Sequence, residues 1–371
     1  MKRFFSYSIL SFFLLLLPTG QASANNNDSI RLSLLTCAPG EEIYSLFGHT
    51  AIRYENPSQG IDVVFNYGLF SFNTPNFIFR FSLGETDYQL GATDYERFAA
   101  EYAFFGRSVW QQTLNLTDEE KTELIRLLQE NYRPENRVYR YNFFYDNCAT
   151  RPRDKIEESI AGKVIYPAEP QDGSLTFRDI VHQYCKGHPW ARFGIDLCIG
   201  NEADRPITQR QMMFAPFYLM DAFDGAQIKG DSIQRPLITT NELVVDATPE
   251  PDESDWMPTP LQYSLLLFIL TTAATIYGIR RRTGLWGIDL FLFGIAGIVG
   301  CVLAFLALFS QHPAVSSNFL LLVFHPGQLL FLPYIIYCVR KGKKCWYLAL
   351  NLVVLTLFIV LFPVIPQRFD F

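Results

Sequence analysis

The pattern of apolar and polar positions gives the N-terminus the three parts of an export signal. Lys2 and Arg3 precede the apolar run Ile9–Leu17, and the small-residue segment Ala22–Ala24 follows it. This order is typical of a secretory signal peptide, which we predict over residues 1–24. An uncleaved anchor helix is the alternative interpretation. With either, the part that follows is expected outside the cytoplasm, in an oxidising compartment.

Near the C-terminus, four apolar stretches are long enough to cross a bilayer. A fully buried helical domain is the alternative, but so many long apolar runs in about 100 residues favour the membrane. We therefore predict a domain of four transmembrane helices over residues 261–363, formed by Leu261–Ile279, Leu285–Phe309, Phe319–Val339 and Trp346–Pro363.

Basic residues orient these predicted spans. Arg280–Arg282 follows the first span and Arg340–Lys344 follows the third, so both basic turns are expected in the cytoplasm. The turn Ser310–Asn318 then lies outside, on the same side as residues 25–245. Between the two parts, Asp246–Pro260 holds five acidic residues and four prolines and is predicted to be an extended linker.

Short runs with strand character open the exported part. Leu32–Thr36 is one, and Thr50–Tyr54 and Ile61–Tyr67 flank a loop rich in turn formers. As a simple hairpin, the last two runs pair Tyr54 with Ile61, which places Asn66 opposite His49 on one face of the sheet. A slip of one residue would put the two side chains on opposite faces.

Further along, strands and helices alternate. Ser108–Leu116 is a predicted strand, and Thr117 with Glu120 forms a capping box that starts a helix. Val138–Tyr145 is a further predicted strand, which leads into a helix that ends near Ile160. The exported part is therefore expected to be an α+β domain.

Charge separates the two parts and excludes some functions. The chain has 371 residues and a net charge of −6, with −14 in residues 25–260 and +6 in residues 261–371. An acidic exported domain would repel phosphates, so we do not expect a nucleic-acid partner. The apolar stretches exclude a wholly soluble protein.

One cysteine and one histidine carry the candidate chemistry. Cys148 lies where a predicted strand turns into a helix N-terminus, where backbone N–H groups can lower a thiol pKa and bind an oxyanion. The expected oxyanion donors are the Cys148 N–H and the Asn147 side chain. His49 is the expected base, with Asn66 to orient it. A structural cysteine and a surface histidine are the alternatives for this pair.

His49 on an early strand, followed much later by an Asn-Cys at a helix start, resembles the circularly permuted papain-like thiol enzymes, which include the lecithin–retinol acyltransferase group. Residues 34–153 are more closely similar to the periplasmic domain of Lnb-type bacterial lipoprotein N-acyltransferases, and the C-terminal spans resemble that family too. The matching pieces are Leu35–Gly40, Phe47–Ala51, Asn66–Gly68, Thr74–Phe77, Thr86–Tyr88, Asp146–Arg151, His312–Val315 and His325-Pro326.

The resemblance implies an acyltransferase of the bacterial inner membrane with its catalytic domain in the periplasm. Cys148 would be the nucleophile and His49 the base, with Asn147 and Arg151 as oxyanion or positioning residues. We expect a phospholipid acyl donor, a diacylglyceryl-Cys lipoprotein acceptor and no cofactor. A cysteine hydrolase of the envelope, acting on peptide or amide bonds, and a non-catalytic envelope receptor are the rival interpretations.

The remaining candidates have weaker signals. Cys185 and Cys198 are expected to form a disulfide, worth about 3 kcal/mol in the chain-entropy model. No Cys/His spacing in the exported part is typical of a metal site. Near the expected outer membrane face, His312, Asn318 and His325 are candidates for a lipid site, since ionisable groups there are costly unless paired. Helix capping and loop packing are the alternative roles for these three.

Overall fold

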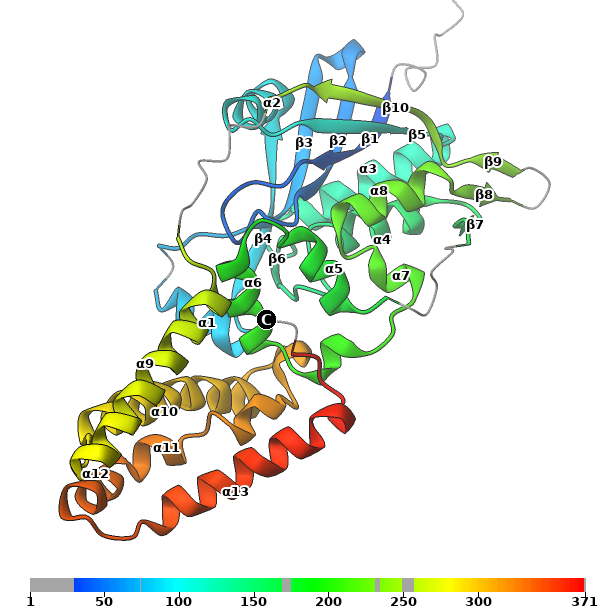
Figure 1. Cartoon of the computed structure of the whole chain (residues 1–371). Coiled ribbons are helices and arrows are strands. Elements are labelled where there is room, and N and C mark those ends of the chain that lie inside the picture. The colour runs from blue at the N-terminus through cyan, green and yellow to red at the C-terminus, as the bar shows by residue number, and fades with distance from the viewer. Residues whose placement is uncertain (1–29, 74, 169–174, 231–233, 249–256, 370–371) are drawn as a thin grey trace, which may run out of the picture.

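The computed structural model describes residues 30–73, 75–168, 175–230, 234–248 and 257–369. The predicted signal peptide lies outside these ranges, and so does more than half of the predicted linker. The described chain forms a domain built on a β-sheet, followed by a helical region (Figure 1). The expected α+β class with an apolar helical region behind it is therefore confirmed.

The sheet has seven strands in the order β10-β5-β1-β2-β3-β4-β6, and all its neighbouring strands run antiparallel. A second sheet has three strands in the order β7-β8-β9. The strands are β1 (Arg31–Cys37), β2 (His49–Asn56), β3 (Ile61–Leu69), β4 (Asp87–Asp94), β5 (Val109–Leu114), β6 (Val138–Arg140), β7 (Lys163–Ile165), β8 (Gln227–Lys229), β9 (Gln234–Pro236) and β10 (Ile238–Val245).

Helices cover both faces of the large sheet (Figure 1). Alternate residues of β1 and β2 pack on opposite sides, as the two-residue period of a strand requires. Leu34 and Ile52 share a core with α3, α4 and α8, whereas Leu35 and Ala51 share one with α2. The helices of this domain are α1 (Phe77–Leu83), α2 (Tyr95–Phe104), α3 (Asp118–Tyr132), α4 (Thr150–Ser159), α5 (Phe177–Tyr184), α6 (Pro189–Cys198), α7 (Gln209–Met212) and α8 (Pro216–Asp224).

The β2–β3 hairpin forms as predicted, but its register differs by two residues. Asn56 pairs with Ile61 across a 3-10 turn, so Asn66 lies opposite Ala51 and not opposite His49. Gly60 closes the turn with a φ of 64°, a backbone conformation that glycine adopts without strain. Because the shift is an even number of residues, Asn66 stays on the predicted face of the sheet.

The predicted capping box of α3 is confirmed, with Thr117 and Glu120 bonded to each other's backbone N–H. The strand predicted over Val138–Tyr145 is shorter than expected and ends at Arg140. Its second half turns back because the Asn142 side chain accepts hydrogen bonds from the Phe144 and Tyr145 N–H groups, both at 3.2 Å. This tight turn delivers the chain to Cys148.

In the helical region, three helices are long and apolar enough to cross a membrane: α9 (Pro260–Arg281), α10 (Trp286–Phe309) and the segment Trp346–Val364, which contains α13 (Trp346–Leu361). The prediction of one continuous span over Phe319–Val339 is wrong. This stretch is broken into a 3-10 turn (Phe319–Leu322), α11 (Gly327–Leu330) and α12 (Leu332–Lys341). Pro326 and Pro333 account for the breaks, because each lacks the N–H that a continuous helix would donate to the preceding turn.

The two basic turns lie side by side at the end of this region farthest from the sheet domain (Figure 1). A Cβ added at Gly284 would come within 2.8 Å of Val339, and the Arg340 guanidinium lies 5.5 Å from the Trp286 ring. One cationic end is what the positive-inside rule requires of a cytoplasmic face.

The opposite end of the helical region docks on the sheet domain through polar contacts. Gly200 N–H donates to the Ala314 carbonyl at 2.7 Å, and Gln311 N–H donates to the Leu83 carbonyl at 2.9 Å. Gln367, near the C-terminus, donates to the Ile199 carbonyl at 3.3 Å. These bonds fix the ends of the apolar helices that lie opposite the basic turns against the sheet domain.

Candidate active site

The candidate site lies at one end of the large sheet, where β2 begins and β3 ends. His49 is the first residue of β2, and α4, which follows Cys148, packs against that strand. The backbone N–H of Thr50 is hydrogen-bonded to Cys148. A Cβ added at Gly68 would lie only 3.5 Å from the Cys148 Cβ. The fold thus places Cys148 against Thr50, the residue that follows His49, although 99 positions separate the cysteine from the histidine that the sequence indicated.

Asn147 builds the turn that presents Cys148. Its side-chain oxygen accepts from the N–H groups of Ala149 and Thr150, at 2.8 and 2.9 Å. Its side-chain nitrogen donates to the carbonyls of Phe143 and Phe214, at 2.8 and 2.9 Å. Because both amide hydrogens are donated, the Asn147 side chain fits a positioning role and has no hydrogen left for an oxyanion.

His49 and Asn66 meet across the hairpin by a diagonal contact. Ala51 is the direct partner of Asn66, so His49 is two residues further along on the same face, a spacing that longer side chains can bridge. The His49 Nε2 lies 3.1 Å from the Asn66 Oδ1. Since that oxygen can only accept, Nε2 carries the hydrogen and Nδ1 is left as the basic nitrogen.

Burial controls the protonation of both groups. It lowers the pKa of His49 to about 4, although the Asn66 hydrogen bond opposes this effect. It raises the pKa of the Cys148 thiol to about 11, against the opposing effect of the Thr50 and Cys148 N–H groups. The expected lowering of the thiol pKa is therefore not found, because desolvation by burial outweighs the effect of these N–H groups. At neutral pH the pair rests as a thiol and a neutral imidazole.

Tyr139 is a polar neighbour that sequence reasoning missed. Its hydroxyl would lie 4.0 Å from a Cβ added at Gly68, and it is buried without a hydrogen-bond partner among the described residues. The Arg151 guanidinium stacks on the Tyr139 ring, 3.5 Å from its centre, and Asp146 holds Arg151 by two hydrogen bonds of 2.6 and 2.8 Å. Tyr139 is recognised as a candidate site residue only because its hydroxyl is buried and unpaired among the described residues, which no sequence motif predicts.

The other exported histidines lie away from Cys148. His182 bonds to the buried Asp196 at 2.8 Å, and Asp196 also binds Arg178, whose side chain is fully buried. His188 is the N-cap residue before α6, with its Nε2 3.9 Å from Glu41. These contacts are between parts of the fold that hold no atom of Cys148 or His49.

The expected Cys185–Cys198 disulfide is not formed, and both residues are free thiols. Cys185 is the C-cap residue after α5 and lies inside an apolar cluster, where burial raises its pKa to about 11. Cys198 ends α6, where its carbonyl receives a hydrogen bond of 3.4 Å from Asn318. The sequence spacing permitted the bond, but the two helices direct the thiols into different surroundings.

The three candidate lipid-site residues do not form one group. His312 bonds to the Phe81 carbonyl at 2.9 Å and Asn318 donates to the Leu197 carbonyl at 2.9 Å, so both join the two domains. His325 lies apart, in a pocket of about 240 Å³ that Asn351 also lines. His312 and Asn318 thus occupy the capping and packing roles, and His325 borders an apolar cavity.

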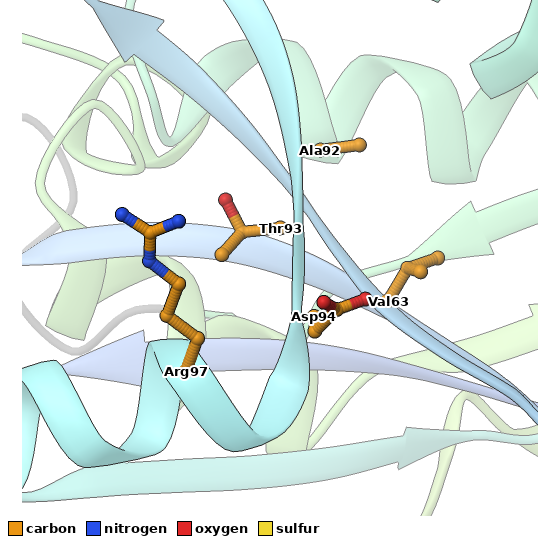
Figure 2. A pocket seen from close by; sticks show the side chains of 5 residues that line it. All are labelled: Val63, Ala92, Thr93, Asp94 and Arg97. Atoms are coloured by element: carbon orange, nitrogen blue, oxygen red, sulfur yellow. The ribbon is translucent and has the colours of Figure 1, made fainter.

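A second pocket, of about 200 Å³, lies between β3, β4 and α2 and is lined by Val63, Ala92, Thr93, Asp94 and Arg97 (Figure 2). It contains neither Cys148 nor His49 and has no place in the site. Among the described residues, no group of three or more His, Cys, Asp and Glu side chains is arranged to hold a metal ion.

Family comparisons agree with this division of the chain. Residues 20–182 match the family model described as the Lnb N-terminal periplasmic domain, and residues 252–371 match the Lnb transmembrane domain. No curated protein and no solved structure gives a significant match. The matches support a membrane protein with a periplasmic N-terminal domain.

Proposed function

Because the chain belongs to the Lnb family, we propose that it is a membrane-bound lipoprotein N-acyltransferase that works through a Cys148 thioester. The donor is a membrane phospholipid and the acceptor is the N-terminal amine of a diacylglyceryl-Cys lipoprotein. The observation that carries the proposal is the contact of Cys148 with the strand that begins at His49, whose Nε2 is held by Asn66.

In the first step, the Cys148 Sγ attacks the ester carbonyl carbon while His49 Nδ1 takes the thiol proton. Both groups are neutral at rest, so proton transfer accompanies attack and no thiolate is stored. The tetrahedral oxyanion is bound by the Cys148 N–H and the Tyr139 hydroxyl. As the C–O bond breaks, the His49 imidazolium returns its proton to the leaving oxygen, and a lysophospholipid alcohol departs.

In the second step, the lipoprotein amine attacks the thioester carbonyl and gives its proton to His49. The C–S bond breaks, and the Cys148 sulfur recovers that proton. The net reaction exchanges an ester for an amide and consumes no nucleotide. Each half-reaction uses the same base and the same oxyanion donors. In both, Asn66 positions His49, Asn147 positions the turn that carries Cys148, and Arg151 positions Tyr139.

The decisive experiment reconstitutes the full-length protein in bilayers with a labelled phospholipid and a diacyl lipopeptide. The parent should carry a hydroxylamine-labile acyl adduct with phospholipid alone and should N-acylate the lipopeptide. Cys148→Ala and Cys148→Ser should lose transfer by more than about a thousandfold while remaining folded and inserted. Near-normal transfer by Cys148→Ala would overturn the thioester mechanism.

Two controls separate the rival activities. A lipopeptide incubated without phospholipid tests whether its own glyceryl esters act as donor, since they are chemically equivalent to those of a phospholipid. N-acylation in that arm would support the Cys148 thioester mechanism, but it would identify the lipopeptide, and not the phospholipid, as the acyl donor. Release of free fatty acid without amide formation would instead favour a hydrolase, and no adduct with any ester would favour a non-catalytic receptor.

A further inference from the structure

Exposed apolar side chains of the sheet domain gather at the site end of the sheet. Among the described residues of 30–245, fifteen large apolar side chains are exposed. Nine of these fifteen lie in or beside the β1–β2, β3–β4 and α2–β5 connections: Ile43, Tyr44, Leu69, Phe72, Ile78, Phe79, Phe81, Phe104 and Phe105.

Strand register shows that these three connections leave one end of the sheet. Cys37, the last residue of β1, lies opposite both His49 and Val109, which begin β2 and β5. Leu69, the last residue of β3, lies opposite Gln89 near the start of β4. The exposed apolar residues therefore surround the end of the sheet at which Cys148 lies.

The β3–β4 connection also reaches the outer end of a membrane helix. The Phe79 ring of α1 lies 5.7 Å from Phe305 of α10, and the Phe81 ring lies 5.7 Å from His312. Phe305 precedes the end of α10 at Phe309 by one helical turn, which is about 6 Å along the axis. Helix α1 thus lies at the depth of the outer membrane interface, beside α10 (Figure 1).

A continuous series of aromatic rings joins this surface to the site. Tyr141 would lie 4.0 Å from a Cβ added at Gly68, next to Cys148, and stacks on Tyr88 with 4.2 Å between ring centres. Tyr88 contacts Phe70 at 5.1 Å, and Phe70 contacts Phe72 at 4.9 Å. Phe72 is 62% exposed. We call Tyr141, Tyr88, Phe70 and Phe72 the ring series.

We propose that Phe72 and Ile78 enter the outer leaflet and that the ring series holds the acyl chain of the donor lipid, with its ester at Cys148. This rests on the proposed acyl transfer and adds the route by which the chain leaves the bilayer. Ile78 is 77% exposed, an exposure that water disfavours and hydrocarbon favours. Aromatic side chains are suited to the interface because they tolerate both environments.

The first test compares two donors in full-length protein reconstituted in nanodiscs. Phe72→Ser and Ile78→Ser should each slow Cys148 acylation from bilayer phospholipid by about tenfold, since each removes one large apolar group from lipid contact. The loss should be clearly smaller with a water-soluble short-chain ester, because that donor does not have to leave a bilayer. Ile165→Ser, on β7 and 40% exposed, is the matched control and should leave both rates unchanged. Bilayer rates within twofold of the parent for both site-end variants would overturn the proposal.

The second test does not depend on catalysis. A phospholipid with a diazirine near the end of one chain is photolysed in nanodiscs that contain the Cys148→Ala protein. Adducts mapped by mass spectrometry should fall on residues 69–83 and 88, and none on residues 163–165. Absence of adducts at 69–83 would overturn the lipid route even if transfer is confirmed. Adducts there without transfer by the parent would leave the route standing and reject the proposed function.

Discussion

The sheet domain and the helical region use their apolar side chains in opposite ways. In β1, six of seven residues are buried, so its apolar side chains pack inside the domain. In α9, which has 22 residues, only Pro260 and Gly278 are buried, so its hydrophobicity faces outward to lipid. Hydrophobicity therefore indicates burial in one part of this chain and membrane contact in the other.

Packing differs in the same sense. The sheet domain is held by large side chains that interdigitate around Phe144, Phe177 and Phe214. The helical region relies on close backbone approach, because a Cβ added at Gly297 or Gly300 would come within 2.5 Å of a neighbouring backbone. Such small-residue contacts are how helices associate when the surrounding lipid is as apolar as the side chains. If the proposed function holds, the chemistry lies in the sheet domain, and the helical region holds that domain at the outer membrane face through contacts such as Phe79 with Phe305.

The largest expected effect tests where the chemistry lies. His49→Ala should reduce transfer by about a thousandfold, comparable to loss of Cys148, because it removes the base that accepts the thiol proton. His182→Ala should leave the transfer rate within a fewfold, since His182 only pairs with Asp196. The measurement is single-turnover acylation of purified protein in bilayers. Similar losses at the two positions would mean that the wrong histidine was chosen.

The next effect concerns the oxyanion. Tyr139→Phe removes one hydroxyl and should reduce transfer by about a hundredfold, the usual cost of losing one oxyanion donor. The free energy of unfolding should not fall, because the hydroxyl is buried without a partner. Rates and thermal unfolding measured on the same preparation separate the two. A normal rate with altered stability would assign Tyr139 a structural role only.

The third prediction tests whether the helical region does more than anchor the sheet domain. Replacing residues 261–363 by one unrelated span, with the linker kept, should preserve membrane attachment, since a single span is an effectively irreversible anchor. Acyl transfer from bilayers should fall by about fiftyfold, because the donor ester is no longer placed beneath Cys148. His312→Ala or His325→Ala alone should cost less. If the span-replaced protein transfers acyl chains at the full rate, the helical region serves only as a membrane anchor.

The smallest effect sharpens the role of the sheet register. Asn66→Ala should lower the acylation rate by about tenfold, since the base is kept but loses its orienter. The Asn66 hydrogen bond raises the pKa of His49, so its loss should move the acidic limb of the pH profile below the parent value of about 4. A water-soluble ester allows this profile to be measured. An acidic limb near pH 6.5 in the parent would contradict the lowered pKa of His49.

Several features were determined by the sequence alone. The capping box of α3 forms as predicted because Thr117 and Glu120 act within one turn and need no tertiary partner. The apolar runs predicted where the helical region lies in the chain, and the two basic turns predicted which of its ends is cationic. The face shared by His49 and Asn66 followed from the two-residue period of strands, which survives any even shift of register.

What only the tertiary structure decided depends on contacts between distant segments. The turn geometry at Gly60 set the register of the hairpin, and the site of Cys148 was completed by Tyr139 and Gly68, which no local pattern connects to it. Burial in that site reversed the expected shift of the thiol pKa, because desolvation exceeds the effect of the few N–H groups left free by Asn147. The apolar composition predicted a third span through Pro326. Proline removes a backbone hydrogen bond that a continuous helix requires, so the segment is broken there. The broken segment packs closely against Gly300 of α10.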